Sequence, residues 1–310
     1  MSFFSIICVL LLEQFKASPA SRIASLQASY GALLERLFDG GHYRHGVTAW
    51  WVGAMLPAAL VFMLGFVLDD YVHPLVAFAF DVALLYFAMG FRQFSHYFTD
   101  IQLALRMGEL DRARSLLAEW RGQGAERLGS AEISRLAIEQ GILSSHRYVF
   151  APLLWFIVFG AAGAVLYRLS LDLATRWGTA EESEPGGRRQ FGLFPRQAFQ
   201  AIDWLPVRLS AVTFAVVGDF EDAVFCWRTQ AEQWPDATSG ILLASGAGAL
   251  GIRLGMPLPE AVGIETRPEL GLGDDADVEH LQSAIGLVWR ALVLCLLLLA
   301  LLSIASWVGS

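Results

Sequence analysis

Charged side chains stand within apolar surroundings at two places in the chain. The segment 203–209, DWLPVRL, carries a carboxylate at Asp203 and a guanidinium at Arg208 between strongly apolar stretches. Arginine donates forked hydrogen bonds to carboxylates and phosphates, so this segment is a candidate for an anion site. Asp81 lies inside an apolar run, where a carboxylate is costly and ordinarily faces a partner or a water-filled cavity. A hydrogen-bonded structural role for Asp81 is the alternative.

Common motifs of enzyme chemistry are missing from the sequence. There is no GxxxxGK[ST], GxSxG or HExxH, and the chain has one lysine, which excludes a P-loop nucleotide site. His96 and Asp100 share a helical face, but no further His or Cys stands at ligand spacing, so a surface hydrogen bond is expected there. The cysteines show no paired spacing. We therefore predict no metal site, no cofactor and no nucleic-acid partner.

The elements that must position these residues are membrane helices. Hydrophobic residues make up 55% of the 310 residues, charged residues 17%, and the mean hydropathy is +0.49. Crossing a bilayer takes roughly 20 apolar residues, and four runs approach this length: 49–68, 73–91, 148–167 and 291–308. We predict an all-α, polytopic membrane helical bundle, with 1–310 as a single domain in the bacterial inner membrane and the lipid bilayer as its first partner.

The segments between these spans predict amphipathic extramembrane helices in two blocks, 92–147 and 168–290. The short apolar run 3–12 predicts a helix that is retained and lies against the membrane, because no positive residue precedes it and Glu13 follows it directly. Within the second block, 178–194 is rich in Pro, Gly and acidic residues and predicts a hinge or a disordered tip. The acidic stretch 267–279 predicts a solvated loop.

Charge placement predicts the orientation of the first two spans. Residues 69–72, between these spans, hold two Asp and no Lys or Arg, whereas 14–48 and 92–147 carry positive residues expected inside. Strict alternation then places 168–290 outside. A re-entrant third span would keep that block inside, and Pro152, Gly160 and Gly163 allow such a break where protein buries it.

Four motifs in order carry a family resemblance over nearly the whole chain. They are GELDRAR at 108–114, EQGILSSHRYVFAPLLW at 139–155, DWLPVRL at 203–209 and GAGALGIRLG at 246–255. Their order and spacing resemble the membrane family that contains adenosylcobinamide-phosphate synthase (CobD/CbiB) and the beta-lactamase regulatory protein AmpE. The resemblance implies a cobalamin-pathway enzyme or an accessory and signalling protein of the same fold.

The chain departs from the synthase pattern at several polar positions. The family's GRDT falls on 122–125, where only Gly122 remains, and its EN pair and following Asp fall on Leu143, Ser144 and Arg147. Its DD pair falls on 199–200, its Asn becomes Asp203, and its SPN falls on 236–238. The synthase joins aminopropanol phosphate to a corrinoid carboxylate at the expense of ATP, which calls for carboxylates that hold magnesium and cations that hold phosphate.

From these losses we predict an AmpE-like accessory or signalling protein of beta-lactamase regulation, without synthase activity. It would hold a protein partner or form a homo-oligomer. The alternative is the synthase itself, an ATP-dependent amide-forming ligase of cobalamin biosynthesis with a corrinoid partner and with magnesium and ATP.

Five polar residues survive at or beside family positions and form the candidate ligand pocket: Glu139, Asp203, Arg208, Arg253 and Arg114. Arginine there would bind an anionic ligand. The alternative, which we favour, is an internal set of ion pairs between Glu139 or Asp203 and Arg208 or Arg253, since buried ion pairs can serve specificity without ligand chemistry.

Overall fold

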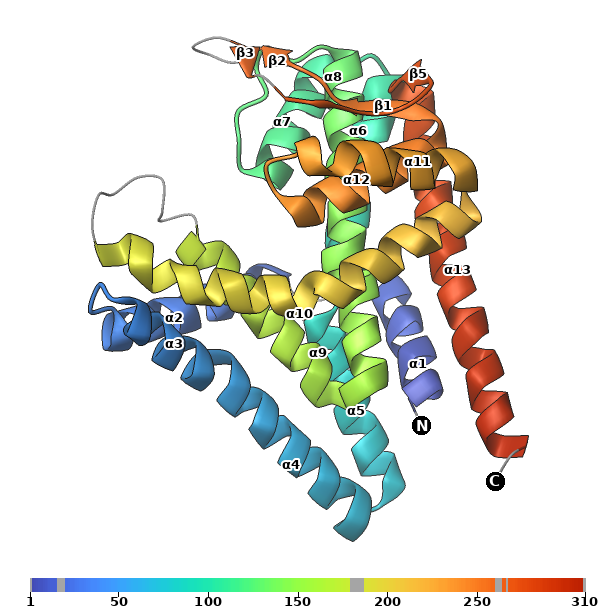
Figure 1. Cartoon of the computed structure of the whole chain (residues 1–310). Helices are drawn as coiled ribbons and strands as arrows, with labels where there is room; N and C mark the ends of the chain where they lie inside the picture. The colour runs from blue at the N-terminus through green and yellow to red at the C-terminus, as the bar shows by residue number, and fades with distance from the viewer. Residues whose placement is uncertain (1, 16–19, 179–186, 260–263, 266, 309–310) are drawn as a thin grey trace. The chain divides into compact units, whose positions relative to one another are not determined.

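Helices form nearly all of the structure, a computed structural model that describes residues 2–15, 20–178, 187–259, 264–265 and 267–308 (Figure 1). The predicted all-α fold class is confirmed. The chain divides into two compact units, Met1–Gly90 with Ala151–Trp204 (unit 1) and Phe91–Phe150 with Leu205–Ser310 (unit 2). The acidic part of the predicted hinge, 179–186, lies outside the described residues, and 187–194 begins a helix.

Unit 1 is built from apolar helices around an aromatic cluster. Trp177 lies 4.8 Å from Phe191 between ring centroids, and Trp50 lies 5.7 Å from Phe194. Leu34 and Leu173 complete this core. Its elements are α1 (Ser2–Phe15), α2 (Ala20–Phe38), α3 (Tyr43–Trp50), the π-turn η1 (Trp51–Met55), α4 (Leu56–Tyr71), α5 (Pro74–Ala88), α9 (Ala151–Gly178) and the first part of α10 (Gly187–Val217).

The chain reverses direction within α9 at Phe159 and Gly160. Gly160 has φ +63° and ψ −154°, outside any helix and open to glycine without strain. A Cβ atom at Gly163 would overlap the carbonyl oxygen of Trp155. In a straight helix these two residues would be about 12 Å apart along the axis, so the second half of α9 returns against the first, as can be followed in Figure 1. The run 148–167 is thus not one straight crossing.

Unit 2 combines helices with a small β structure. Its helices are α6 (Phe91–Arg106), α7 (Leu110–Arg121), α8 (Ser130–Ser145), the π-turn η2 (His146–Phe150), the rest of α10, α11 (Phe220–Gln230), η4 (Ala231–Gln233), α12 (Ala237–Leu250) and α13 (Val278–Val308). Strand β1 (Ile252–Gly255) pairs antiparallel with β4 (Glu269–Gly271) and parallel with β5 (Asp274–Asp275), while β2 (Leu258–Pro259) pairs with β3 (Ile264–Glu265).

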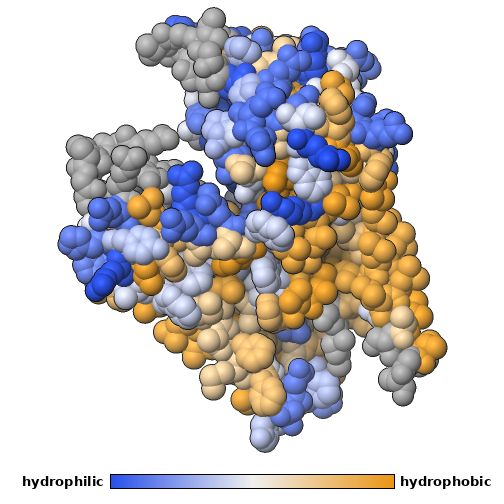
Figure 2. Space-filling model, in the orientation of Figure 1, coloured by the Kyte–Doolittle hydropathy of each residue, from blue (hydrophilic) through white to orange (hydrophobic). Residues whose placement is uncertain are grey.

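Four helices within the described residues are long and apolar enough to cross a membrane: Tyr43–Tyr71, Ser130–Gly178, Gln190–Val217 and Val278–Ala305. Figure 2 shows apolar side chains gathered along α13, where Leu297, Leu301 and Leu302 are exposed, as a lipid-facing helix requires. Of the expected spans, 73–91 corresponds to the shorter helix α5, Pro74–Ala88. Gln190–Val217 lies within the block expected outside the membrane.

The reversal in α9 predicts the side of the membrane on which α10 begins. Because the chain turns back at Gly160, we expect residue 187 on the side from which α9 starts, which the positive charges of the preceding sequence assign to the inside. A cysteine introduced by Gly187→Cys in the full chain should resist a membrane-impermeant maleimide in intact cells and react after lysis. Asp70→Cys, in the last turn of α4, is the outside control. Labelling of residue 187 in intact cells would contradict this topology.

The close approach at Gly163 predicts a cost for any side chain there. Gly163→Ala forces a methyl group against the backbone of Trp155, so we expect the unfolding free energy to fall by about 1–3 kcal/mol or more. Gly65→Ala in α4 is the matched control, because its new Cβ would meet nothing closer than Phe80 at 4.0 Å. Thermal unfolding of both variants in one detergent tests this. Equal melting temperatures would show that α9 does not fold back tightly.

Candidate functional site

Helix α8 presents an acidic and a basic side chain one turn apart, at Glu139 and Arg135. Residues four apart lie on one face of a helix, and the two opposite charges attract each other through space. Both are buried: Glu139 is 5% exposed and Arg135 9%. Among the described carboxylates of unit 2, that of Glu139 alone is buried. An ionised group in such a place needs partners of opposite charge or hydrogen-bond donors.

The partners of Glu139 come from both arms of the β1 and β4 pair. The backbone N–H of Gly255, at the end of β1, donates to Oε1 at 2.9 Å. The guanidinium of Arg267, two residues before β4, donates to Oε2. Gly255 has φ +74°, and a Cβ there would overlap the carbonyl oxygen of Pro268, so the turn requires glycine. One carboxylate therefore closes the hairpin onto α8.

Arg267 is held by contacts on its other sides. Its guanidinium carbon lies 4.9 Å from the ring centroid of Trp234, a cation–π contact. The strand that follows Arg267 is tied to α11, because the side chain of Gln230 accepts from the N–H of Gly271 at 2.6 Å and donates to its carbonyl at 3.2 Å. These contacts fix the plane of the guanidinium.

Arg135 has a much weaker set of partners. Its Nη1 donates to the sulfur of Met256 at 3.2 Å, and a thioether is a weak acceptor. The Nε of Arg135 and the Nη1 of Arg267 are buried without a hydrogen-bond partner. Arg267 thus pairs with Glu139, Arg135 lies one turn away on α8, and each guanidinium leaves a donor unused.

The structure distributes the five candidate pocket residues over both units. Asp203 belongs to unit 1, where it is fully buried and accepts from the Tyr167 hydroxyl at 3.0 Å. The other four belong to unit 2. Arg253 pairs with Asp275 at 2.9 Å and Glu269 at 3.5 Å. Arg114 donates to the carbonyl of Leu128 and to Asp111, both at 2.9 Å.

The prediction that Glu139 forms an ion pair with Arg208 or Arg253 was wrong. Glu139 binds Arg267 and neither Arg208 nor Arg253. Arg267 lies in the stretch 267–279, which was expected to be a solvated loop but contributes β4 and β5. Its pairing depends on strand register, which the sequence pattern does not reveal. Arg135 could have been found, because its spacing from Glu139 is that of a helical ion pair.

The described residues do not fit a magnesium ion held by the protein alone. They contain no group of three or more His, Cys, Asp or Glu side chains placed to hold a metal. Both carboxylate oxygens of Glu139 already accept hydrogen bonds. Thiol chemistry is also disfavoured in unit 2, because burial raises the pKa of the Cys226 thiol to about 11, so it is protonated at neutral pH.

Asp81 lines a cavity of about 290 Å³ within unit 1. The cavity also contacts Asp69 and the reversal at Phe159 and Gly160. An acidic residue inside an apolar helix thus adjoins the point where the helical backbone is interrupted. Its role stays a prediction.

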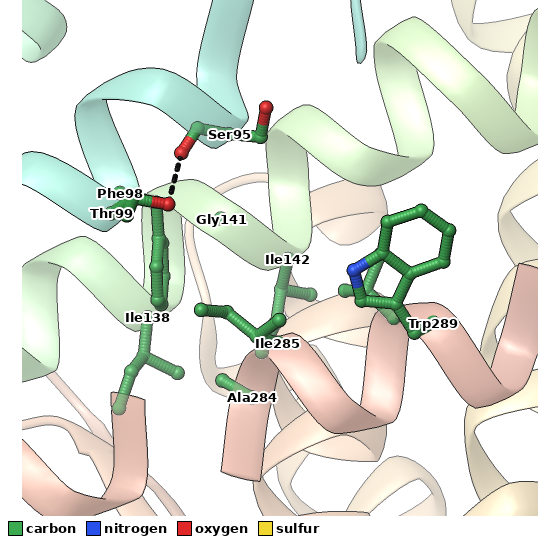
Figure 3. A pocket seen from close by; sticks show the side chains of 10 residues that line it. Ser95, Phe98, Thr99, Ile138, Gly141, Ile142, Ala284, Ile285 and Trp289 are labelled. Atoms are coloured by element: carbon green, nitrogen blue, oxygen red, sulfur yellow. Dashed lines mark hydrogen bonds between the residues drawn. The ribbon is translucent and has the colours of Figure 1, made fainter. Parts of the chain in front are cut away.

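An apolar cavity of about 270 Å³ occupies unit 2 between α6, α8 and α13 (Figure 3). Ile138, Ile142 and Ile285 point into it, and Trp289 stands at one end. Its volume lies below the roughly 300–1,000 Å³ of sites for drug-sized ligands, so a macrocycle would not fit inside. Ile138 of α8 lines this cavity, and the next residue of the same helix is Glu139.

Comparison with known proteins gives the family. The model of the family described as CobD/Cbib protein matches residues 8–288. The chain belongs to the CobD/Cbib family. A cobalamin biosynthesis protein CobD of Stutzerimonas stutzeri is 35% identical over 304 residues, covering 96% of each chain. The protein of the same name from Chromobacterium violaceum is 35% identical over 71% of this chain and 69% of its own. No solved structure matches.

These relatives contradict the interpretation as an AmpE-like protein without synthase activity. The relatives similar over most of the chain carry the name cobalamin biosynthesis protein. Replacement of family polar positions such as Leu143, Ser144 and Arg147 was therefore a poor guide to function. In this CobD/Cbib chain the buried Glu139 pairs with Arg267, whose side chain is 10% exposed, and the buried Arg135 lies one turn away on α8.

The burial of Glu139 predicts a large stability effect. Glu139→Gln keeps an acceptor for Gly255 but removes the charge between two buried guanidinium groups, so we expect a loss of about 3 kcal/mol in the free energy of unfolding. Glu269→Gln, on a carboxylate that is 51% exposed, should cost less than about 1 kcal/mol. Unfolding in detergent, followed by tryptophan fluorescence, measures both. Equal losses would contradict a central role for Glu139.

Proposed function

We propose that the chain is an enzyme of cobalamin biosynthesis, an adenosylcobinamide-phosphate synthase that attaches aminopropanol phosphate to a carboxylate of adenosylcobyric acid. The observation that carries the proposal is the 35% identity to a cobalamin biosynthesis protein CobD over 96% of both chains. The corrinoid is the proposed partner, and the proposed location is the bacterial inner membrane.

The charges of the Glu139 cluster suit an amide-forming reaction on anionic reactants. Such a reaction must hold an amine against a carboxyl carbon and neutralise phosphate and carboxylate charges. ATP, as a co-substrate, would supply the energy for the condensation. Arg135 and Arg267 offer guanidinium donors, and Glu139 holds Arg267 in a fixed orientation. We assign Glu139 a positioning role, because both of its oxygens are occupied by protein donors.

The reversal in α9 also supports the proposal. An ATP-dependent step needs its site on the cytoplasmic side, and a reversal at Gly160 is consistent with both ends of α9 being on one side of the membrane. The positive residues of the block 92–147 favour the inside.

Restoration of corrinoid amidation tests the proposed function. In a strain that lacks the synthase, expression of this chain should restore growth that depends on adenosylcobyric acid and aminopropanol phosphate. Glu139→Ala should lose this ability because Arg267 loses its anchor.

The matched control is Glu269→Ala, which removes an exposed carboxylate of the same hairpin and should still complement. The amount of each protein in membranes is measured by immunoblot, so that loss of protein is separated from loss of activity. Failure of the unmodified chain at normal membrane levels would overturn the proposed function. Full complementation by Glu139→Ala would place the site elsewhere.

A further inference from the structure

We propose that Arg135 and Arg267 form the binding site for a dianionic phosphate monoester. Arg267 pairs with Glu139, Arg135 stands one turn before Glu139 on α8, and both arginines retain buried N–H donors without partners, Nε of Arg135 and Nη1 of Arg267. Buried donors without partners cost free energy, and an oxygen-rich anion would supply the missing acceptors.

Arg135 is a buried cation that no carboxylate of the described residues bonds directly. Arg135 and Arg267 carry two positive charges against one negative charge on Glu139. Glu132 and Asp275 attract Arg135 through space but make no hydrogen bond with it, and Asp275 is engaged by Arg253 at 2.9 Å. The Glu139 cluster thus retains one positive charge that lacks a directly bonded carboxylate.

Met256 occupies the position that the ligand would take on Arg135. Its sulfur is the acceptor for Nη1 at 3.2 Å, a weak contact for a charged donor. Its backbone has φ +65°, which is costly for a residue other than glycine. An anion that displaces this thioether would replace a weak acceptor with a charged one. The described arrangement is therefore the closed form of the phosphate site.

The fixed orientation of Arg267 favours phosphate over a flexible surface contact. Arg267 stacks on Trp234 at 4.9 Å and is anchored by Glu139, so its free donor has a fixed direction. Arg135 projects from the same helix face as Glu139. Two forked groups held in this way match tetrahedral phosphate oxygens.

The identity of the monoester rests on the proposed function, in which it is the phosphate of aminopropanol phosphate. The fixed carboxylate of Glu139 beside the phosphate site would attract the positively charged amine of the same molecule. A lipid phosphate, as in phosphatidic acid, offers the same chemistry from another source.

Titration calorimetry on the full chain in detergent tests the assignment. Aminopropanol phosphate and inorganic phosphate should bind, and aminopropanol should not. Arg135→Met should weaken both phosphate ligands about tenfold or more, because charge-assisted hydrogen bonds are lost. Arg112→Met is the matched control, since it removes the same charge from a side chain that is 55% exposed, and should leave binding unchanged.

A second variant guards against misfolding of Arg135→Met. Arg135→Lys keeps the charge but loses the fork, so binding should weaken severalfold while the melting temperature stays near that of the unmodified chain. Phosphate binding that is unaffected by both folded variants would overturn the site. If the two variants weaken the binding of short-chain phosphatidic acid but not the binding of aminopropanol phosphate, the choice of a soluble ligand is overturned.

The outcome is separable from that of the proposed function. If the chain complements but the Arg135 variants bind phosphate as tightly as the unmodified chain, the site is overturned and the synthase function stands. Phosphate binding that depends on Arg135, in a chain that does not complement, would support the site and overturn the function.

Discussion

The buried charge of Glu139 is the constraint on which the polar half of unit 2 depends. A carboxylate that is 5% exposed has to be matched by donors, because an unpaired ion in a protein interior is far less stable than in water. Gly255 and Arg267 supply these donors from opposite arms of one strand pair. Satisfying one side chain therefore determines where the strand pair lies on α8, which glycine is required at its turn, and which arginine is buried beside it.

Helix α8 links this polar cluster to the apolar part of unit 2. Glu139 accepts a hydrogen bond from Gly255, and Arg135 donates one to Met256. Ile138 and Ile142 instead line the cavity between α8, α6 and α13 (Figure 3). Helix α13 then continues as a run of exposed apolar side chains suited to lipid. The Glu139 cluster and the cavity against α13 therefore share neighbouring residues of α8.

The sequence predicted the fold class because apolar runs of membrane length are a strong signal. Pro152, Gly160 and Gly163 also indicated where α9 could break, and the reversal occurs at Gly160. The long helix over Gln190–Val217 was harder to find, because Arg196, Asp203 and Arg208 dilute its hydropathy. The role of Arg267 could not be predicted at all, because it depends on the register that pairs Leu254 with Leu270. Local sequence carries no record of that register.

The lost motif positions and the retained buried charges give opposite indications of function, and burial explains which is the better guide. Leu143, Ser144 and Arg147 replace family polar residues, yet neither oxygen of Glu139 depends on them, since its donors come from the hairpin. A charged residue held between buried partners is difficult to replace, because each partner left behind becomes an uncompensated ion. A polar residue that touches only ligand can be exchanged without disturbing the fold. The burial of Glu139 against its donors is therefore a better guide to which residues the fold depends on than the number of motif letters that remain.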